Sequence, residues 1–297
     1  MRSDPASEPL VSVIVPTKNR PAQVAALLRS LAESTYSHLE VIVNDDVNSS
    51  DDTQQLARAF TGLSVRYLRT NCSRAQGRLD AVEQAEGDIL LHLDSDMTVS
   101  PGLVAECVEL LGTGCDALVI PEVSHGQGFW ARCKVLEKAL YQGVEALESV
   151  RCLPTALYKK VGGHDPELVF SEDKDLDLRL RARGITIGRT SQVIHHDEGQ
   201  VSLVGVLRKR WQTTQGAERF AEKHPDSFWW QRNILNRYAL FVKKAPLGLR
   251  HFLPYAGLLF LKTLEYGISF TRLFVERLLS LGTPMKPAAK CEGQSVD

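Results

Sequence analysis

The chain has 297 residues, of which 43% are hydrophobic and 24% are charged, a composition typical of a folded globular protein. Its 35 basic and 36 acidic residues nearly cancel, which gives no support for broad nucleic-acid binding, since that would leave a basic footprint. The six cysteines show neither a CxxC pair nor zinc spacing, so we expect free thiols in a reducing compartment. No apolar signal sequence opens the chain, and no run of about 18 apolar residues predicts a membrane span.

The first hundred residues alternate between short apolar runs and stretches with helical spacing. The apolar runs are rich in β-branched residues, and they predict four buried strands, over residues 10–16, 39–44, 63–68 and 89–93. Apolar residues at helical spacing predict three helices between them, over residues 21–34, 54–60 and 74–85. Strands that alternate with helices indicate an α/β fold with a mostly parallel central sheet and flanking helices.

The rest of the chain is predicted to contain more helices than strands. The expected helices cover residues 103–111, 129–148, 172–183 and 204–216, and the expected strands cover residues 117–120, 185–188 and 192–194. From residue 217 onwards aromatic and apolar residues predict further helices. We therefore expect four parts: a disordered start over residues 1–9, an α/β domain over residues 10–216, a helical extension over residues 217–282 and a disordered tail over residues 283–297.

Polar clusters follow three of the predicted strands, namely Thr17–Arg20, Asp45–Asp46 and Asp94–Asp96. Ligands of open α/β sheets bind beyond the carboxyl ends of the strands, so these clusters are expected to meet at one edge. The Asp-x-Asp pair offers the oxygen ligands that suit Mg²⁺ or Mn²⁺ together with substrate phosphates. Taken alone, this short motif is also compatible with a solvated acidic turn.

Three segments, Val11–Arg20, Val41–Asp46 and Gly87–Asp96, resemble the family 2 glycosyltransferases, inverting enzymes with the Rossmann-like GT-A fold. The resemblance implies a nucleotide-diphosphate sugar as donor and Mn²⁺ or Mg²⁺ as cofactor. It assigns nucleotide-sugar binding to Pro16, Thr17, Asn19, Arg20, Asp45, Arg78, Asp94 and Ser95. For Arg78, an exposed helix cation is an equally good interpretation. After Asp45-Asp46 the family usually has Gly-Ser, whereas this chain has Val47-Asn48, which puts the nucleotide contacts of this loop in doubt.

A second set of segments, Gly162–Pro166 and Ser171–Gly184, resembles the Gly-Gly-x-Asp and Glu-Asp-x-Asp-Leu motifs of the same family. The resemblance implies that Asp173 is the catalytic base. Carboxylates in a first helical turn are also stabilised by the helix dipole, which is the interpretation that we prefer for the other acids of this helix. His164 stands where the family often has Phe. The residues expected on the acceptor side are Gly163, His164, Glu172, Arg210 and Trp211.

Two adjacent histidines, His195 and His196, stand beside acidic residues after a predicted strand, where an imidazole can reach a metal ion. The family often supplies a His ligand at this place, and the His-x-Glu-Gly form favours His196 over His195. The predicted metal ligands are therefore Asp94, Asp96 and His196.

The roles of two C-terminal segments, a basic helix and an apolar stretch, are left open by the sequence. The basic helix around Arg208–Arg210 is expected to face a diphosphate, an acidic membrane surface or only solvent. The apolar stretch after Pro246 is interrupted by Arg250, Lys262 and Glu265, and each charge at a bilayer centre costs about 2.5–3.5 kcal/mol. Amphipathic helices on a membrane surface and a helical lid packed on the core fit this pattern equally well.

These observations together predict a metal-dependent inverting glycosyltransferase of glycan or cell-surface polysaccharide synthesis. Its expected partners are a nucleotide-diphosphate sugar and an acceptor glycan or lipid-linked acceptor, without nucleic acid. The expected location is cytoplasmic, with attachment to the inner face of the cell membrane left open. Two alternatives are a sugar-phosphate nucleotidyltransferase, whose early Gly-rich loop is missing here, and a non-catalytic nucleotide-sugar binding protein, which would not need Asp173.

Overall fold

A computed structural model describes residues 8–71, 73–168, 171–214, 217–245 and 249–280. The predicted disordered tail, residues 283–297, lies outside this range, as do residues 1–7 of the predicted disordered start. The four cysteines within the described residues are free, as expected for a reduced protein, and they are Cys107, Cys115, Cys133 and Cys152.

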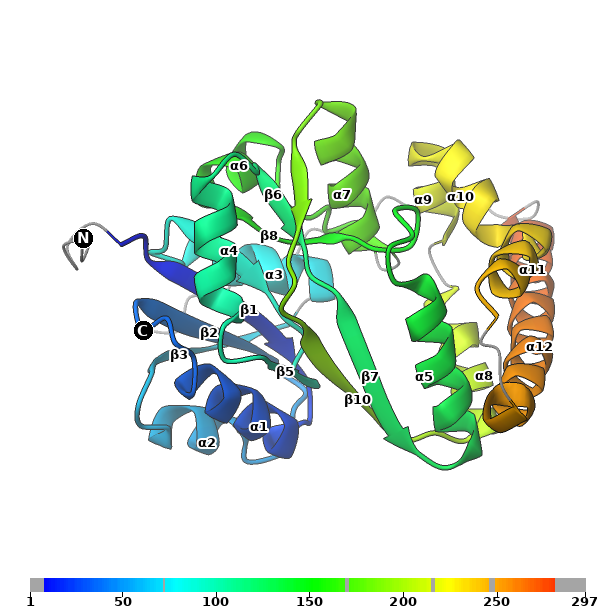
Figure 1. Cartoon of the computed structure of the whole chain (residues 1–297), viewed down its shortest axis with the longest axis horizontal. Helices are drawn as coiled ribbons and strands as arrows, with labels where there is room; N and C mark the ends of the chain where they lie inside the picture. Colours follow the sequence, from blue (N-terminus) through cyan, green and yellow to red (C-terminus); the bar gives the residue numbers. More distant parts are fainter. Residues whose placement is uncertain (1–7, 72, 169–170, 215–216, 246–248, 281–297) are drawn as a thin grey trace.

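A seven-stranded sheet with the order β3-β2-β1-β4-β8-β6-β9 forms the centre of the molecule (Figure 1). Its strands are β1 (Val11–Thr17), β2 (Leu39–Asp46), β3 (Ser64–Thr70), β4 (Ile89–His92), β6 (Ala117–Val119), β8 (Val150–Pro154) and β9 (Ile187–Arg189). The first four strands pair in parallel, and β8 runs antiparallel to both of its neighbours. The mostly parallel α/β sheet predicted from the alternation of strands and helices is confirmed.

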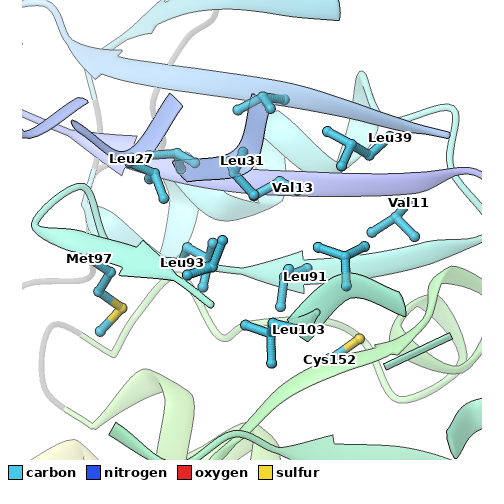
Figure 2. Packing of buried hydrophobic residues seen from close by; sticks show 14 of the residues in the cluster. Val11, Val13, Leu27, Leu31, Leu39, Leu91, Leu93, Met97, Leu103 and Cys152 are labelled. Carbon is cyan, nitrogen blue, oxygen red and sulfur yellow. The ribbon is translucent and has the colours of Figure 1, made fainter. Parts of the chain in front are cut away.

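Helices cover both faces of this sheet because the strands are apolar on both sides. They are α1 (Pro21–Ala32), α2 (Thr53–Ala59), α3 (Arg74–Glu83), α4 (Leu103–Gly112), α6 (Thr155–Lys160) and α7 (Glu172–Ala182). In β1, Val13 points into a cluster with Leu27 and Leu103, and Ile14 points into the opposite cluster with Leu176. Figure 2 shows the first cluster between β1, α1 and α4. Each fully buried side chain of this kind contributes about 1.5–3 kcal/mol.

A second, three-stranded sheet with the order β5-β10-β7 lies beside the carboxyl edge of the main sheet. It contains β5 (Met97–Val99), β7 (Glu122–Gln127) and β10 (Ile194–Gln200). His196 on β10 pairs with Met97 on β5, which places it beside the Asp-x-Asp motif. The expectation that His195 and His196 follow a strand is wrong, because both lie within β10.

Helix α5 (Phe129–Tyr141) is shorter than the predicted helix over residues 129–148. It ends because Gln142 adopts an extended conformation with ψ 132° and Gly143 has φ +72°, a left-handed conformation that glycine adopts without strain.

The C-terminal helices pack together at one end of the molecule, beside α5 (Figure 1). They are α8 (Leu203–Thr213), α9 (Ala217–Lys223), α10 (Pro225–Arg232), α11 (Ile234–Lys243) and α12 (Leu249–Ser280). Buried Cys133 and Leu140 of α5 contact Phe241 of α11 and Leu258 of α12. At the crossing, a Cβ on Gly257 would lie 2.7 Å from the sulfur of Cys133, so only glycine permits this close approach. Among the described residues, every helix is too short or too polar to cross a bilayer.

Candidate active site

The carboxyl ends of β1, β2 and β4 surround a cavity of about 650 Å³, a size typical of small-molecule sites. Most residues that the sequence predicted for the donor and the metal line it: Pro16, Thr17, Arg20, Asp45, Asp94, Ser95, Asp96 and His196. The parallel strands bring together the side chains of three distant segments of the chain, and β10 of the second sheet adds His196 from a fourth. Two other residues predicted to bind the nucleotide sugar, Asn19 and Arg78, are not among the residues that line this cavity.

Asn19 joins two of the loops at this edge instead of lining the cavity. Its backbone N–H donates to the hydroxyl of Ser49 at 3.1 Å, and its side-chain oxygen accepts from the backbone N–H of Ser50 at 2.9 Å. Asn19 has φ +53°, a left-handed conformation that Asn tolerates better than most residues. The Ser49 hydroxyl also donates to Asp45 at 2.5 Å, so Asn19 indirectly holds the Asp45 carboxylate in place.

Asp45 is 2% exposed and accepts a second hydrogen bond, from the hydroxyl of Tyr67, at 2.9 Å. Burial, together with this contact, raises the pKa of Tyr67 to about 12, so the phenol remains a donor at physiological pH. The orientation of the Asp45 carboxylate at the cavity wall is therefore determined by two hydroxyl groups.

Asp96 and His196 form the pair best suited to a divalent cation. Asp96 Oδ2 and His196 Nε2 are 3.5 Å apart, close to the spacing of about 3 Å between neighbouring ligands of one octahedral ion. Arg20 also contacts Asp96 Oδ2. Burial opposes ionisation of Asp96, yet His196 and Arg20 hold the pKa of this carboxyl well below its usual range. Burial likewise opposes charge on His196, but Asp96 and Glu198 raise its pKa.

The other side of His196 faces acidic groups, with Nδ1 at 3.5 Å from Glu198 Oε1. A carboxylate that accepts a hydrogen bond from this nitrogen commonly orients a metal-bound imidazole, but here Nδ1 is buried without a hydrogen-bond partner among the described residues. Within the described residues, no group of three His, Cys, Asp or Glu side chains is arranged to hold an ion. Asp96 and His196 thus fit a cation that takes its remaining ligands from a substrate and water.

Asp94 is held by arginines. Its Oδ1 accepts from Arg78 Nη2 at 2.9 Å, and Arg151 Nη2 lies 3.6 Å from Oδ2. Arg78 is fully buried, and its Nη1 donates to Glu172 at 3.0 Å and to Asp173 at 2.7 Å. The interpretation of Arg78 as an exposed helix cation is therefore wrong. A buried guanidinium needs such partners, and here they connect the Asp-x-Asp motif to the first turn of α7.

Asp173 lines a second cavity, of about 220 Å³, which shares Lys138 with the first. Its side chain is 31% exposed. Burial opposes ionisation, but Arg78 and His164 hold the pKa of Asp173 well below its usual range. Both contacts fall on Oδ1, at 2.7 Å from Arg78 and 3.0 Å from His164, and neither involves Oδ2. Asp173 is thus an ionised carboxylate at neutral pH, beside a cavity.

The residues predicted on the acceptor side are dispersed. His164 is 1% exposed and lies behind Asp173, next to Gly163. Glu172 is 5% exposed and pairs with Arg78, while burial and the neighbouring Asp173 raise its pKa. Arg210 lines a third cavity of this region, with a volume of about 480 Å³, and a smaller one of about 70 Å³.

Trp211 is 42% exposed and lies under the guanidinium of Arg272, at 5.0 Å from its ring centroid. It faces away from the cavities because it is one residue further along α8 than Arg210, and successive helical residues point in directions about 100° apart.

The sequence reasoning missed a group formed by Arg151 on β8, Glu122 on β7 and Lys138 on α5. Arg151 pairs with Glu122, and Lys138 Nζ lies 3.2 Å from the same carboxylate. Burial opposes ionisation of Glu122, but these cations lower its pKa to about 2. The signal available in the sequence was the alternation of apolar Val150, charged Arg151 and apolar Cys152, which is typical of a strand.

Comparison with known proteins gives the family. Residues 12–161, just over half of the chain, match the model of Glycosyl transferase family 2. The chain belongs to this family. It is 28% identical over 222 residues to the O-antigen biosynthesis protein RfbC of Myxococcus xanthus, a match that covers 64% of this chain and 17% of the relative.

Another relative is the GalNAc(5)-diNAcBac-PP-undecaprenol beta-1,3-glucosyltransferase of Campylobacter jejuni, which is 30% identical over 111 residues. That match covers 36% of each protein. The matched segments thus span between about a sixth and a third of these relatives' own length.

Solved glycosyltransferases have the same fold. The mannosyltransferase PcManGT from Pyrobaculum calidifontis, in complex with GDP-Man and Mn²⁺, superposes with a TM-score of 0.64 and 17% identity, over 92% of this chain and 89% of that chain. Residues 1–349 of Staphylococcus aureus TarS, in complex with UDP-GlcNAc, superpose with a TM-score of 0.57 and 18% identity, over 90% and 91%. The predicted GT-A fold with a helical C-terminal extension is confirmed.

Proposed function

We propose that this family 2 protein transfers a sugar from a nucleotide-diphosphate sugar to an acceptor, with inversion at the anomeric carbon. One observation carries the proposal: the Asp96–His196 pair and the ionised Asp173 lie on two cavities that share Lys138. A cation site on one side and a carboxylate base on the other are what a single displacement needs.

The nucleotide sugar occupies the 650 Å³ cavity in this proposal. The Thr17 hydroxyl is buried without a partner among the described residues, and Asp45 lies beside it, so both are available to the nucleoside. Arg20, Arg74 and Lys209 line the same cavity and offer positive charge to the diphosphate. The nucleotide sugars bound in the PcManGT and TarS structures support this assignment.

Mn²⁺ or Mg²⁺ bound by Asp96 and His196, with Asp94 nearby, would offset the charge that develops on the leaving diphosphate. The Mn²⁺ in the PcManGT structure supports a cation in this role.

Asp173 acts as the general base. An acceptor oxygen attacks the anomeric carbon, the bond to the diphosphate oxygen breaks, and the acceptor proton passes to Asp173 Oδ2. Arg78 and His164 occupy Oδ1 and restrain the carboxylate. Such base assistance contributes about 10²–10⁴-fold to the rate.

The test is release of the nucleoside diphosphate from UDP- and GDP-sugars with Mn²⁺. We expect Asp96→Ala to abolish turnover and Asp173→Asn to retain donor affinity while kcat falls at least about 100-fold. Glu109→Gln, an exposed change on α4, is the control. Wild-type activity in Asp96→Ala, or release of pyrophosphate instead of the nucleoside diphosphate, contradicts the proposal.

We further propose that the C-terminal helices lie on a membrane and present a lipid-linked acceptor. Helix α12 buries Leu258 and Leu261 beside the charged pair of Lys262 and Glu265. On its other side it exposes three large aromatic side chains, with Phe252, Phe260 and Phe270 at 66%, 52% and 71% exposure. Of the fifteen exposed large hydrophobic side chains in the part of the chain whose burial is described, twelve lie between residues 204 and 275. Such a concentration marks an interaction surface, and the exposed cations Arg208 and Lys243 favour anionic lipid as its partner.

The acceptor named for the Campylobacter relative, a diphosphate of undecaprenol, supports this choice. We expect the full chain to sediment with phosphatidylglycerol vesicles at low salt and less so at high salt. Phe260→Glu with Phe270→Glu should abolish sedimentation, whereas Val123→Glu, an exposed change on β7, should not. A wild-type protein that stays in the supernatant and forms a dimer would instead make this face an interface between copies.

A further inference from the structure

The third cavity, of about 480 Å³, extends the catalytic region into the C-terminal helices. It shares Lys138, His196 and Lys209 with the donor cavity, and it shares Lys138 and Tyr141 with the cavity of Asp173. A smaller cavity of about 70 Å³ adjoins it at Arg210, Arg237 and Lys262. Together they form a path that leads from Asp173 to a space between α8, α11 and α12.

The acidic groups of this space already have partners. Glu137 lies 2.5 Å from both Lys134 and Lys262, and Glu198 lies 3.5 Å from His196. In contrast, Arg210 and Arg237 have no acidic partner among the described residues. The surplus of charge in the cavity is therefore positive.

Arg237 carries the strongest sign of an absent ligand. It is 8% exposed, and its Nη1 has no hydrogen-bond partner among the described residues. Its guanidinium is held at 4.9 Å from the ring centroid of Tyr141 and 5.7 Å from that of Trp230. These aromatic contacts orient the cation but leave its charge uncompensated, and a buried charge without a counter-ion is unfavourable.

Arg210 lies on the same cavity walls, and its Nε donates to the hydroxyl of Ser269 at 2.6 Å. Arg232 lines the smaller cavity. Burial lowers the pKa of Arg232, and the like charge of Arg210 lowers it further. An anion between these arginines would relieve the repulsion and supply the missing hydrogen bond of Arg237 Nη1.

We propose that Arg210 and Arg237 bind a phosphate or diphosphate group of the acceptor. The inference rests on the proposed glycosyl transfer and specifies its acceptor class. Guanidinium groups recognise phosphate through paired, charge-assisted hydrogen bonds, and two arginines from different helices can grip one group. A phosphate bound here places the adjoining sugar on the side of Tyr141 and Lys138, which leads to Asp173.

The first experiment uses pyrophosphate as a probe in metal-free buffer, with binding followed by calorimetry. We expect Arg237→Gln and Arg210→Gln each to lower the affinity for pyrophosphate at least about tenfold. Affinity for UDP in the presence of Mn²⁺ should stay unchanged. Arg29→Gln is the control, because Arg29 is an exposed arginine on α1 and lines none of these cavities. Equal affinity for pyrophosphate in all variants overturns the proposal.

The second experiment compares lipid-linked sugar diphosphates, soluble sugar phosphates and unphosphorylated sugars as acceptors. Arg237→Gln should lose at least about tenfold in kcat/KM with phosphorylated acceptors only, and Arg237→Lys should lose less. Donor hydrolysis by water should be unaffected. A loss shared by donor hydrolysis and all acceptors would show a general defect and refute the acceptor role. No donor hydrolysis in the wild type would instead refute the proposed function.

A different observation concerns the support of Asp173. The backbone N–H of His164 donates to the Tyr158 oxygen at 3.1 Å, so the phenolic proton of Tyr158 points to His164 Nδ1 at 2.8 Å. The remaining nitrogen, Nε2, must then carry the ring proton, and it donates to Asp173 Oδ1 at 3.0 Å. His92 packs against both rings, with centroids 4.9 Å from His164 and 5.3 Å from Tyr158.

We infer that His164 is a positioning residue for the base, since it fixes Oδ1 together with Arg78 and leaves Oδ2 for the acceptor proton. Phe, which often stands at this place in the family, cannot make this hydrogen bond. The test compares His164→Phe with His164→Gln, whose amide can donate from nearly the same place as Nε2. A hydrogen bond to a charged group contributes about 1.5–3 kcal/mol, which corresponds to a loss of about tenfold or more.

We expect His164→Phe to lower kcat about tenfold or more at unchanged donor KM, and His164→Gln to recover most of it. Tyr158→Phe, which leaves the tautomer of His164 undetermined, should give an intermediate kcat. Melting temperatures identify variants whose loss reflects folding. Equal kcat for the Phe and Gln variants shows that the hydrogen bond has no role in positioning the base.

Discussion

Removing one carboxylate between α5 and α12 should separate these two helices. Glu137 is 3% exposed and lies 2.5 Å from the ammonium groups of both Lys134 and Lys262. It also accepts from the hydroxyl of Tyr141 at 2.6 Å. The fourth charged member is Glu265, which is 5% exposed and pairs with Lys262. Two anions thus balance two cations in a buried cluster.

Glu137→Ala leaves this cluster with an uncompensated buried positive charge. Breaking a buried ion pair by removing one partner costs about 3–5 kcal/mol, a large part of the 5–15 kcal/mol that stabilises a typical domain. Glu137→Met combined with Lys262→Met removes one charge of each sign. Because apolar replacements of complete buried pairs are often neutral, we expect this double variant to stay within about 1 kcal/mol of the wild type.

Urea unfolding measures the free energies, and limited proteolysis after α11 reports the release of α12. Trp130 on α5 and Trp230 on α10 provide fluorescence near the contact. If the free energy of unfolding of Glu137→Ala lies within about 0.5 kcal/mol of the wild-type value, water reaches the cluster and the reasoning is wrong.

The same cluster predicts a pH dependence. Burial opposes the charge on Glu137, but Lys134 and Lys262 hold its pKa well below the ordinary value of 4.5. Its contribution is therefore complete above that value and is lost as the pH falls through the lowered pKa. The pKa values of Lys134 and Lys262 are raised above 10.5, so their contribution is complete below 10.5 and is lost as the pH rises through the raised values. We expect α12 to stay docked between these limits.

Three further predictions concern the metal pair, the sheet and helix α12. His196→Ala should weaken Mn²⁺ binding in calorimetry more than His195→Ala does, because Nε2 of His196 faces Asp96, and the opposite order would make His195 the ligand. Gly87→Ala should destabilise the protein by at least about 1–3 kcal/mol, since its Cβ would lie 2.6 Å from the Ser12 backbone nitrogen. Gly267→Ala on α12, with open space around it, should instead stabilise by up to about 1 kcal/mol, and equal urea midpoints for the two variants would contradict this.

Much of the fold could be predicted because local patterns determine it. Alternate burial of Val13 and Ile14 on opposite faces follows from an apolar run, and parallel pairing follows from the helices between the strands. The meeting of Asp45 and Asp96 at one cavity is a consequence of that topology. The short strands β5, β7 and β8 were missed. In β7 the reason is its sequence, Glu-Val-Ser-His-Gly-Gln, which has no apolar run.

The contacts around the base could not be predicted for a different reason. Arg78 reaches Asp173 across 95 residues of sequence, and the partner on the other side, Asp94, lies 16 residues away. The periodicity of apolar residues predicts helices and strands, but it does not predict contacts between residues so far apart in the sequence. An arginine on an amphipathic helix is usually solvated, and only the position of α7 beside α3 converts it into a fully buried bridge.

Helix α12 connects the two proposals about the acceptor. Its inner face contributes Lys262 and Glu265 to the wall of the third cavity, and its outer face exposes Phe260 and Phe270. If that outer face rests on a bilayer, the arginines behind the helix lie within one helix diameter, about 10–12 Å, of the lipid surface. A diphosphate at the headgroup level of a lipid-linked acceptor then reaches Arg210 without leaving the membrane. A soluble acceptor needs no such arrangement, so loss of vesicle binding in the Phe260→Glu, Phe270→Glu variant should impair transfer to lipid-linked acceptors and leave transfer to soluble sugar phosphates unchanged.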